Sequence, residues 1–487
     1  MKAPDTDHFI QTGIKIARNV SQAEQLANTA LSILNSSPKF LRTLPDLTGQ
    51  KGYMWRLTYS ISSSLAVVLK SLRQGMKKQP APSSGNGYSV LLVSHYLSPD
   101  QLEKSEDFYL GTLEKCLDAA GISNCKVMVN HAKSSNHDHF GNDGRTYLLA
   151  PLLSPFVELS NLSRLIKASL KLPLIDDDPN AKRFSRLARI AGFDHRAMAN
   201  LRIHDQIRQA VISLRPDAII FTHEGHGWER MIAMTAHQQA WPIKVIGYHH
   251  TVLFPGPRAI NFNIGQGADP DHLFFAGDIT AEIFAKESEY HKSKIGVLGS
   301  NKVLREVEHG GKNIKKRLCL IVPEGEMGEV RLMVQAGIHA ARALPDIRFV
   351  LRLHPVIQRD LVQSYINGES PPDNFSVSSQ SLDEDVASSG WVIYRASSVV
   401  LNGMMAGATP IYLNIDQSQH NNDPIPAGCD FRKTADTFDA ITEIINNDLR
   451  LSVSEKEATE AQAKKFAQSY FVALQPEKLI SLLKQQD

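Results

Sequence analysis

The sequence has little of what marks secreted, disulfide-linked or membrane-spanning proteins. Its 487 residues include four cysteines, none in a Cys-x-x-Cys pair, which argues against a zinc or disulfide framework and is typical of reduced thiols. No run reaches the ~18–20 apolar residues of a membrane-spanning helix. The first residues also lack the apolar core of a signal peptide. We therefore expect a cytoplasmic protein.

A strong charge of either sign is also missing. The 53 basic and 51 acidic residues leave a net charge of +2, so we expect no nucleic-acid partner. Two local basic clusters, at residues 70–78 and 182–189, are compatible with contact to anionic lipid and equally with ordinary solvated helix faces. Peripheral contact with the cytoplasmic face of the inner membrane stays open, and the sequence does not indicate an oligomeric state.

The chain does have the length and the β–α alternation of a two-domain protein. Residues 1–85 are predicted to be a helical extension that ends in a linker rich in proline, serine and glycine at 79–87. Apolar runs then alternate with helical patterns in residues 86–308 and again in 309–454, which predicts two Rossmann-like α/β domains with parallel sheets. Residues 455–487 are expected to form C-terminal helices that cross back to the first domain.

The predicted strands are short apolar runs with β-branched residues. They fall at residues 88–94, 126–130, 218–222, 244–248, 272–276, 294–298, 317–322, 348–353, 391–394 and 411–413. The stretch 148–200 carries four prolines and is predicted to be an insertion of loops and short helices. Because ligands bind at the carboxyl ends of parallel strands, the side chains that follow these runs are the candidates for chemistry.

Two motifs in the second domain follow strands in this way. His354 precedes Pro355, and a histidine at a strand end can donate a hydrogen bond to a phosphate as negative charge develops on it. Ser397 and Ser398 lie between a strand and a helix, where hydroxyls and backbone N–H groups can bind an anion. Either motif alone would suit an ordinary turn or helix cap, but their order on one domain favours a phosphate site.

Glu224 is the candidate general base of the first domain. It directly follows strand 218–222 and the residue His223, and partial desolvation is expected to raise its pKa toward neutrality. Gly225 would let the backbone pass close to a substrate. Glu229 is expected to pair with Arg230 or a neighbour on the next helix. A loop glutamate held in an ion pair is the alternative for Glu224 itself.

Further polar residues surround these motifs. His249, His250 and Arg258 follow strand 244–248 and are candidates to bind a sugar carboxylate or an acceptor, although each histidine also suits a plain turn. Possible metal ligands lie in polar loops, and we expect no metal there: they are Asp176, Asp177, Asp178, His131, His137, Asp138 and His139.

The ordered motifs resemble those of bacterial GT-B glycosyltransferases of the sialyltransferase and Kdo-transferase-like group, which includes surface carbohydrate biosynthesis proteins. That group shares an acidic-Gly motif, then His-Pro, then paired serines, and this chain has 224–225, 354–355 and 397–398 in that order. The resemblance extends over residues 90–471. It departs at His223, where the group often has a second acid.

The resemblance implies a GT-B fold and inverting transfer of an acidic sugar such as Kdo, a sialic-acid-like sugar or another nonulosonic acid. The donor would be a CMP-sugar, and the acceptor a surface polysaccharide or lipid-linked glycan, as in capsule or lipopolysaccharide biosynthesis. Because such a donor leaves as a monophosphate, no metal or other cofactor is obligatory.

The resemblance also implies roles for individual residues. Glu224 would activate the acceptor, and His354 with Ser397 and Ser398 would bind the CMP phosphate. The loop of Pro323, Glu324 and Gly325 would lie near the base or ribose. Independently of the resemblance, the candidates to bind acceptor or sugar are His223, His249, His250 and Arg258. A UDP-hexosamine transferase or epimerase of the same fold, and a catalytically inactive GT-B glycan-binding scaffold, remain alternatives.

Overall fold

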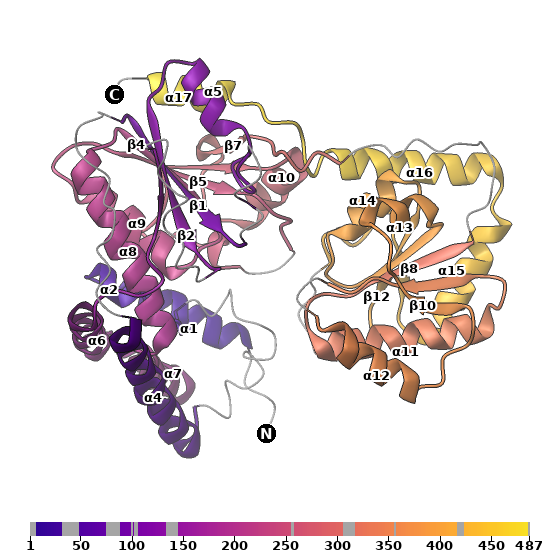
Figure 1. The fold of residues 1–487 in the computed structure, drawn as a ribbon, viewed down its shortest axis with the longest axis horizontal. Coiled ribbons are helices and arrows are strands. Elements are labelled where there is room, and N and C mark those ends of the chain that lie inside the picture. The colour runs from indigo at the N-terminus through magenta and orange to yellow at the C-terminus, as the bar shows by residue number, and fades with distance from the viewer. Residues whose placement is uncertain are drawn as a thin grey trace.

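The apolar runs form two separate parallel sheets in the computed structural model of the protein (Figure 1). The structure describes residues 6–31, 48–74, 88–98, 101, 106–132, 145–254, 258–304, 317–354, 357–415 and 423–485. Several predicted features lie outside these residues: the linker 79–87, the basic residues Lys77 and Lys78, His137, Asp138, His139 and Pro355. The predicted fold class, two Rossmann-like α/β domains with a helical N-terminal extension, is confirmed.

The first sheet has seven parallel strands in the order β3-β2-β1-β4-β5-β6-β7. In chain order they are β1 (Val90–Tyr96), β2 (Asn124–Asn130), β3 (Thr146–Leu148), β4 (Ala218–Thr222), β5 (Lys244–His249), β6 (His272–Phe275) and β7 (Ile295–Val297). Strand β4 is buried at all five positions, as expected when helices cover both faces of a sheet.

The helices that accompany this sheet include a long insertion. They are α5 (Leu113–Ala119), α6 (Pro155–Leu170), α7 (Pro179–Ala191), α8 (His195–Leu214), α9 (Gly227–His237) and α10 (Asp278–Glu287), with 3₁₀ turns η4 (Ala259–Asn261) and η5 (Lys292–Lys294). The expectation of loops and short helices in 148–200 was wrong, because Pro155 and Pro179 start helices α6 and α7. Proline is favoured at the first helical position, where its missing N–H would have no partner in any case.

The N-terminal extension packs beneath the first sheet against the insertion (Figure 1). Its helices are α1 (Thr6–Arg18), α2 (Ala23–Leu26) and α4 (Gln50–Gln74). A shared apolar core joins them to α6, α7 and α8. A buried ion pair of 2.6 Å between Arg56 of α4 and Asp194, the N-cap residue of α8, adds a polar link within this layer.

The second sheet has six parallel strands in the order β10-β9-β8-β11-β12-β13. Its strands are β8 (Leu318–Val322), β9 (Arg348–Leu351), β10 (Phe375–Val377), β11 (Trp391–Tyr394), β12 (Thr409–Leu413) and β13 (Lys433–Ala435). The helices after β7 are α11 (Met327–Ala343), α12 (Arg359–Gly368), α13 (Leu382–Ser388), α14 (Val399–Met405), α15 (Phe438–Arg450), α16 (Val453–Gln468) and α17 (Glu477–Lys484). Strands β3, β10 and β13 were not predicted; each has only three residues, although β7, equally short, was.

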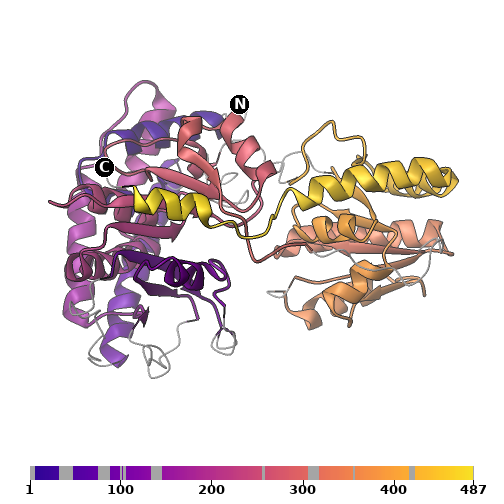
Figure 2. The same ribbon diagram turned by 90° about the horizontal axis from the view of Figure 1, so that it is seen from above.

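The C-terminal segment joins the two domains, as Figure 2 shows from above. Helix α16 packs on the second domain against α14, and the chain crosses only after it ends. The Tyr470 hydroxyl lies within hydrogen-bond distance of the carbonyls of Leu253 and Pro424, one in each domain. Helix α17 then packs on the first domain, where Leu479 is fully buried.

We expect Leu479→Ala to lower the free energy of unfolding of the first domain by ~2–5 kcal/mol, because it leaves a cavity in that core. Urea unfolding checks this. The matched control is Val453→Ala on α16, whose side chain is 61% exposed; it should change stability by less than ~0.5 kcal/mol. Equal losses for both variants would contradict the docking of α17.

Candidate active site

Polar side chains meet at the carboxyl edge of the first sheet. Strands β1, β4 and β5 are neighbours there, with Thr222 at the end of β4 in register with Tyr248 of β5. The residues at and just after these ends include His95, Glu224 and His250. The strand-end rule thus brings the predicted base and a predicted sugar-binding histidine to one place.

Glu224 forms an ion pair with His226, two residues further along the loop. Their Oε2 and Nε2 atoms are 3.2 Å apart, and Nε2 of His250 lies 3.9 Å from Oε1 of Glu224. Burial opposes charge on both members. The hydrogen bond and charge of His226 nevertheless lower the pKa of Glu224 to about 2. The carboxylates of Glu229 and Glu224 raise the pKa of His226 to about 9.

The expectation that the pKa of Glu224 would rise toward neutrality was therefore wrong. Burial is the largest single influence on this carboxyl and raises its pKa, but the hydrogen bond and charge of His226, together with the effects of His250 and His249, outweigh it. At neutral pH the pair consists of a carboxylate and an imidazolium, and Glu224 is in the ionised form that a general base requires.

The buried side chain of Glu229 fixes the backbone of the loop 224–226. It is 1% exposed, and its Oε2 atom accepts hydrogen bonds from the backbone N–H of Glu224 at 2.9 Å and of His226 at 2.8 Å. Burial would raise the pKa of this carboxyl, but the charges of His226 and His223 hold it below its usual range. The expected pairing of Glu229 with Arg230 is not the one found, since Arg230 pairs with Asp269.

A glycine is required at position 225 because another segment of the chain lies against it. Its φ is +82°, and a Cβ atom there would lie 2.8 Å from the backbone of Ala259 and Ile260. The close approach found at Gly225 is to residues 259–260 of the same chain, whereas the approach to a substrate stays a prediction. The Glu224 loop rests on this segment.

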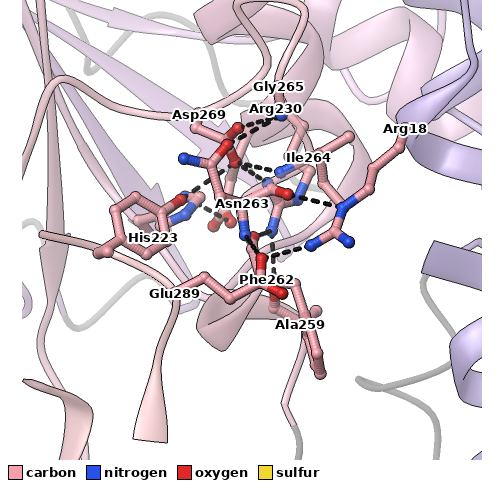
Figure 3. A network of polar contacts seen from close by, with 12 residues as sticks. Arg18, His223, Arg230, Ala259, Phe262, Asn263, Ile264, Gly265, Asp269 and Glu289 are labelled. Atoms are coloured by element: carbon pink, nitrogen blue, oxygen red, sulfur yellow. Dashed lines mark hydrogen bonds and ion pairs between the residues drawn. The ribbon is translucent and has the colours of Figure 1, made fainter. Parts of the chain in front are cut away.

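A polar network, drawn in Figure 3, also holds the segment that begins at residue 259. Arg230 bonds to the carboxylate of Asp269 and donates to the carbonyls of Ala259, at 2.6 Å, and Phe262, at 3.0 Å. Arg18 of helix α1 donates to the Asn263 carbonyl at 3.0 Å. The N-terminal extension therefore helps to support the candidate site.

His95, which the sequence analysis missed, borders the loop and contacts His131, which was considered there only as a possible metal ligand. Nδ1 of His95 lies 2.7 Å from Nε2 of His131, and Nε2 of His95 lies 2.6 Å from the Thr222 hydroxyl. Burial lowers the pKa of His95 to about 4, and the charge of His131 adds to this. His95 follows the first predicted strand directly, so the strand-end rule could have found it.

The remaining first-domain candidates differ in exposure. His223 is fully buried, with Nδ1 3.3 Å from Oε2 of Glu229. Burial lowers the pKa of His249 to about 4 and that of His250 to about 3, so both are neutral. Lys302, also missed, lies near Glu224, and burial lowers the pKa of its ammonium group.

The second sheet presents a similar edge. Val322, the last residue of β8, is in register with Tyr394 of β11, so Arg395 follows beside the turn that contains Glu324. His354 follows the neighbouring strand β9 and is exposed. Three adjacent strands thus carry His354, Glu324 and Arg395 at their carboxyl ends.

Arg395 is the residue of this edge that sequence reasoning did not single out. It is only 7% exposed, and its buried Nη1 atom has no hydrogen-bond partner among the described residues. Burial and the charge of Glu329 raise the pKa of Glu324 to about 7, against the opposing charges of Arg258 and Arg395. A buried donor of this kind can be satisfied by an anion.

Arg258 of the first domain interacts electrostatically with Glu324 at the carboxyl edge of the second sheet. It lies in the first domain after β5, with its guanidinium 5.5 Å from the centre of the Phe254 ring. Burial lowers its pKa, while the charges of Glu324 and Glu287 oppose that change. Because Glu324 belongs to the second domain, charged groups of both domains act on one another here.

The loops of the two domains share a pattern. Both read Glu-Gly-x-x-x-Glu, in residues 224–229 and 324–329, and both connect a central strand to a helix. Glu329 accepts a hydrogen bond of 2.9 Å from the Glu324 N–H, as Glu229 does from the Glu224 N–H. This local repeat went unnoticed in the sequence.

The paired serines lie where expected but make few contacts. The Ser397 hydroxyl accepts a 3.4 Å hydrogen bond from the Val399 N–H, and Ser398 is exposed. Helix α14 has only seven residues, so the positive electrostatic potential at its N-terminus adds little to the binding of an anion. The predicted phosphate role of the serines stays a prediction.

No group of three or more metal-ligating side chains suited to a metal occurs in the described part of the chain. Asp178 instead caps helix α7 through the N–H groups of Asn180 and Ala181. His131 contacts His95.

The Glu224–His226 pair should make stability depend on pH. The raised pKa of His226 stabilises the fold fully below its unfolded value of 6.5, and this is lost as pH rises through about 9. The lowered pKa of Glu224 stabilises the fold above 4.5, and this is lost as pH falls through about 2. The stability difference between wild type and His226→Gln should thus be largest between pH 4.5 and 6.5.

Urea unfolding as a function of pH measures that difference. Proton NMR supplies the matched readout: Glu224→Gln should lower the pKa of His226 from about 9 toward 6.5. A wild-type His226 that already titrates near 6.5 would show that the pair does not form.

Comparison with known proteins gives little beyond these observations. No protein-family model matches the chain, and no curated protein matches it. Similar solved structures include the glycotransferase of kitacinnamycin, with 13% identity, a TM-score of 0.48, and coverage of 83% of this chain and 100% of that one. The UDP-GlcNAc 2-epimerase from Neisseria meningitidis bound to UDP-GlcNAc has 13% identity, a TM-score of 0.47, and coverage of 81% and 100%. At these values the likenesses carry no argument about function.

Proposed function

We propose that this protein is a GT-B glycosyltransferase that moves a sugar from a nucleotide donor to an acceptor hydroxyl. The donor phosphate would bind the second-domain edge, and the acceptor would lie at the first-domain edge. The observation that carries the proposal is the buried, unsatisfied guanidinium N–H of Arg395 beside Glu324, on a sheet edge whose charges act across to Arg258 of the first domain.

The chemistry assigned to the site is a single displacement. The acceptor oxygen forms a bond to the anomeric carbon, and its proton goes to the carboxylate of Glu224. The bond from that carbon to the phosphate oxygen breaks, and the electron pair leaves with the phosphate. Arg395 and His354 would stabilise the charge that develops on it. Attack opposite the leaving group inverts the anomeric centre.

The partial protonation of Glu324 at neutral pH is compatible with a phosphate leaving group. With a pKa of about 7, the carboxyl of Glu324 is partly protonated at neutral pH. A protonated carboxyl can donate a hydrogen bond to a phosphate oxygen, whereas an ionised one would repel it. An approaching phosphate would raise this pKa further.

The finer part of the proposal is a CMP-activated acidic sugar such as Kdo or another nonulosonic acid. It rests on the motif resemblance and on the donors around Glu224. Lys302 supplies positive charge there, the neutral imidazoles of His249 and His250 can donate hydrogen bonds, and Arg258 adds positive charge nearer to Glu324. A sugar carboxylate could be bound by such groups. A surface glycan or lipid-linked acceptor and a cytoplasmic location complete the proposal.

Nucleotide binding tests the donor site. Calorimetry with CMP, UDP, GDP and ADP should show selective binding of CMP, and Arg395→Met should weaken it ~10–100-fold, because a charged hydrogen bond to phosphate contributes ~1.5–3 kcal/mol. The control is Arg317→Met, an exposed arginine just before β8, which should bind as wild type does. Selective UDP binding would favour the hexosamine alternative, and binding of no nucleotide would reject a nucleotide-sugar transferase.

Transfer assays with CMP-Kdo and CMP-sialic acid test the base. Glu224→Gln preserves the shape of the side chain but removes its basicity, so transfer should fall by ~10²–10⁴ while nucleotide affinity is unchanged. Glu282→Gln, an exposed carboxylate on α10 of the same domain, is the matched control. Full activity of Glu224→Gln would remove Glu224 from the mechanism.

A further inference from the structure

Two neighbouring helices expose an unusual number of large apolar side chains. Nineteen such side chains are exposed in the described part of the chain, and eleven of them belong to α4 and α6. They are Met54, Trp55, Ile61, Leu65, Leu69 and Leu72 on α4, and Phe156, Val157, Leu159, Ile166 and Leu170 on α6. We call these eleven residues the α4–α6 surface. Single exposed apolar residues are ordinary, whereas a concentration of this kind marks an interaction site.

On each helix the exposed residues follow helical spacing. On α4 they recur at steps of four and three through Leu65, Leu69 and Leu72, and on α6 the same steps relate Ile166 to Leu170 and Phe156 to Leu159. Residues three and four apart share one helix face. Helices α4 and α6 contact each other beneath the first sheet, and Figure 1 places them on the side of the first domain away from the second.

Helix α4 buries several polar side chains next to the apolar ones, Tyr53, Val67 and Val68, that join it to the core. Its buried positions include Arg56, Ser60, Ser64 and Ser71. Arg56 pairs with Asp194 inside, and the Ser64 hydroxyl donates to a backbone carbonyl. In water, a helix packed on a protein buries its apolar face and exposes its polar one. The outer face of α4 is therefore more apolar than that of an ordinary surface helix.

The exposed charges on the two helices are all positive. They are Lys51, Lys70 and Arg73 on α4, and Lys167 and Lys171 on α6. Helix α4 contains no acidic residue, and the single acid of α6, Glu158, is buried in an ion pair with Arg202. A surface that combines apolar side chains with lysine and arginine is complementary to a bilayer with anionic headgroups. An acidic protein partner would explain the charge but not the width of the apolar face.

Aromatic residues support the same occupant. Trp55 is 57% exposed and stacks on Tyr59 with ring centres 5.5 Å apart. Phe156, at the start of α6, is 79% exposed. Tryptophan and tyrosine are enriched where protein meets the headgroup level of a membrane. None of the helices that the structure describes is long and apolar enough to cross a bilayer, so contact would be with its surface.

We propose that the α4–α6 surface binds the surface of an anionic lipid bilayer, with its apolar side chains inserted among the headgroups. This inference goes beyond the proposed sugar transfer and does not depend on it. It keeps the part of the first basic cluster that lies on α4, Lys70 and Arg73, and drops residues 182–189, which lie on α7 and have no exposed large apolar side chain beside them. The competing occupant is a second copy of the chain.

Vesicle flotation of the full chain tests the proposal. The protein should float with phosphatidylcholine vesicles that contain phosphatidylglycerol and remain unbound with phosphatidylcholine alone. Leu65→Glu and Leu170→Glu should each abolish flotation, because they place a carboxylate on the inserted face. Both positions are exposed, at 48% and 64%, so thermal unfolding should be unchanged. Lys70→Glu combined with Arg73→Glu should remove the part of the binding that salt weakens.

The controls are Leu361→Glu and Val453→Glu, exposed apolar positions on the second domain at 57% and 61%, which should float as wild type does. Absence of flotation in the wild type, or equal loss in these controls, would overturn the proposal. Sedimentation without vesicles addresses the second copy: a wild-type dimer that Leu65→Glu converts to monomer would assign the surface to self-association. Unchanged nucleotide affinity in all variants would separate this result from any failure at the active site.

Discussion

The buried carboxylate of Glu229 is the constraint on which the candidate site depends. A carboxylate that is 1% exposed is stable only when it is well paired, and here the partners are two backbone N–H groups of the loop above it. Those bonds fix the backbone on both sides of Gly225, and so place Glu224 beside His226. The same charge raises the pKa of His226. One buried acid thus determines both the shape of the loop and the ionisation of the groups that it presents.

The second domain repeats the shape of this loop but not its charge. Glu329 accepts from the Glu324 N–H as Glu229 does in the first domain, yet burial raises its pKa, and that of Glu324 rises to about 7. The difference arises because the first loop contains His226 where the second contains Glu326. One edge therefore carries an ionised carboxylate–imidazolium pair, and the other is partly protonated near a buried arginine. A site that accepts a proton on one side and binds an anion on the other needs this division.

The sequence predicted the parts of this arrangement that depend on strand ends. Strands β4 and β11 begin and end at the predicted residues, and the rule that side chains after parallel strands converge brought Glu224 and His250 together. The pKa of Glu224 could not be predicted, because it depends on which neighbour within reach carries a proton. His95 and Arg395 also follow predicted strands and were overlooked. The orientation of α4 was beyond prediction, since an amphipathic pattern does not say which face is buried.

Packing connects helix α4 to the loop that carries Glu224. The side chain that draws Arg56 inward is Asp194, which also caps helix α8 through the N–H groups of residues 196 and 197. Helix α8 packs along α9, with His204 and Thr235 2.8 Å apart, and α9 begins at the loop that Glu229 holds. Helices packed in this way move together, so contact of α4 with a bilayer would fix the orientation of the first sheet edge relative to the lipid. An acceptor carried in that bilayer would then approach Glu224 from one side only, and the second domain would remain free to deliver the donor.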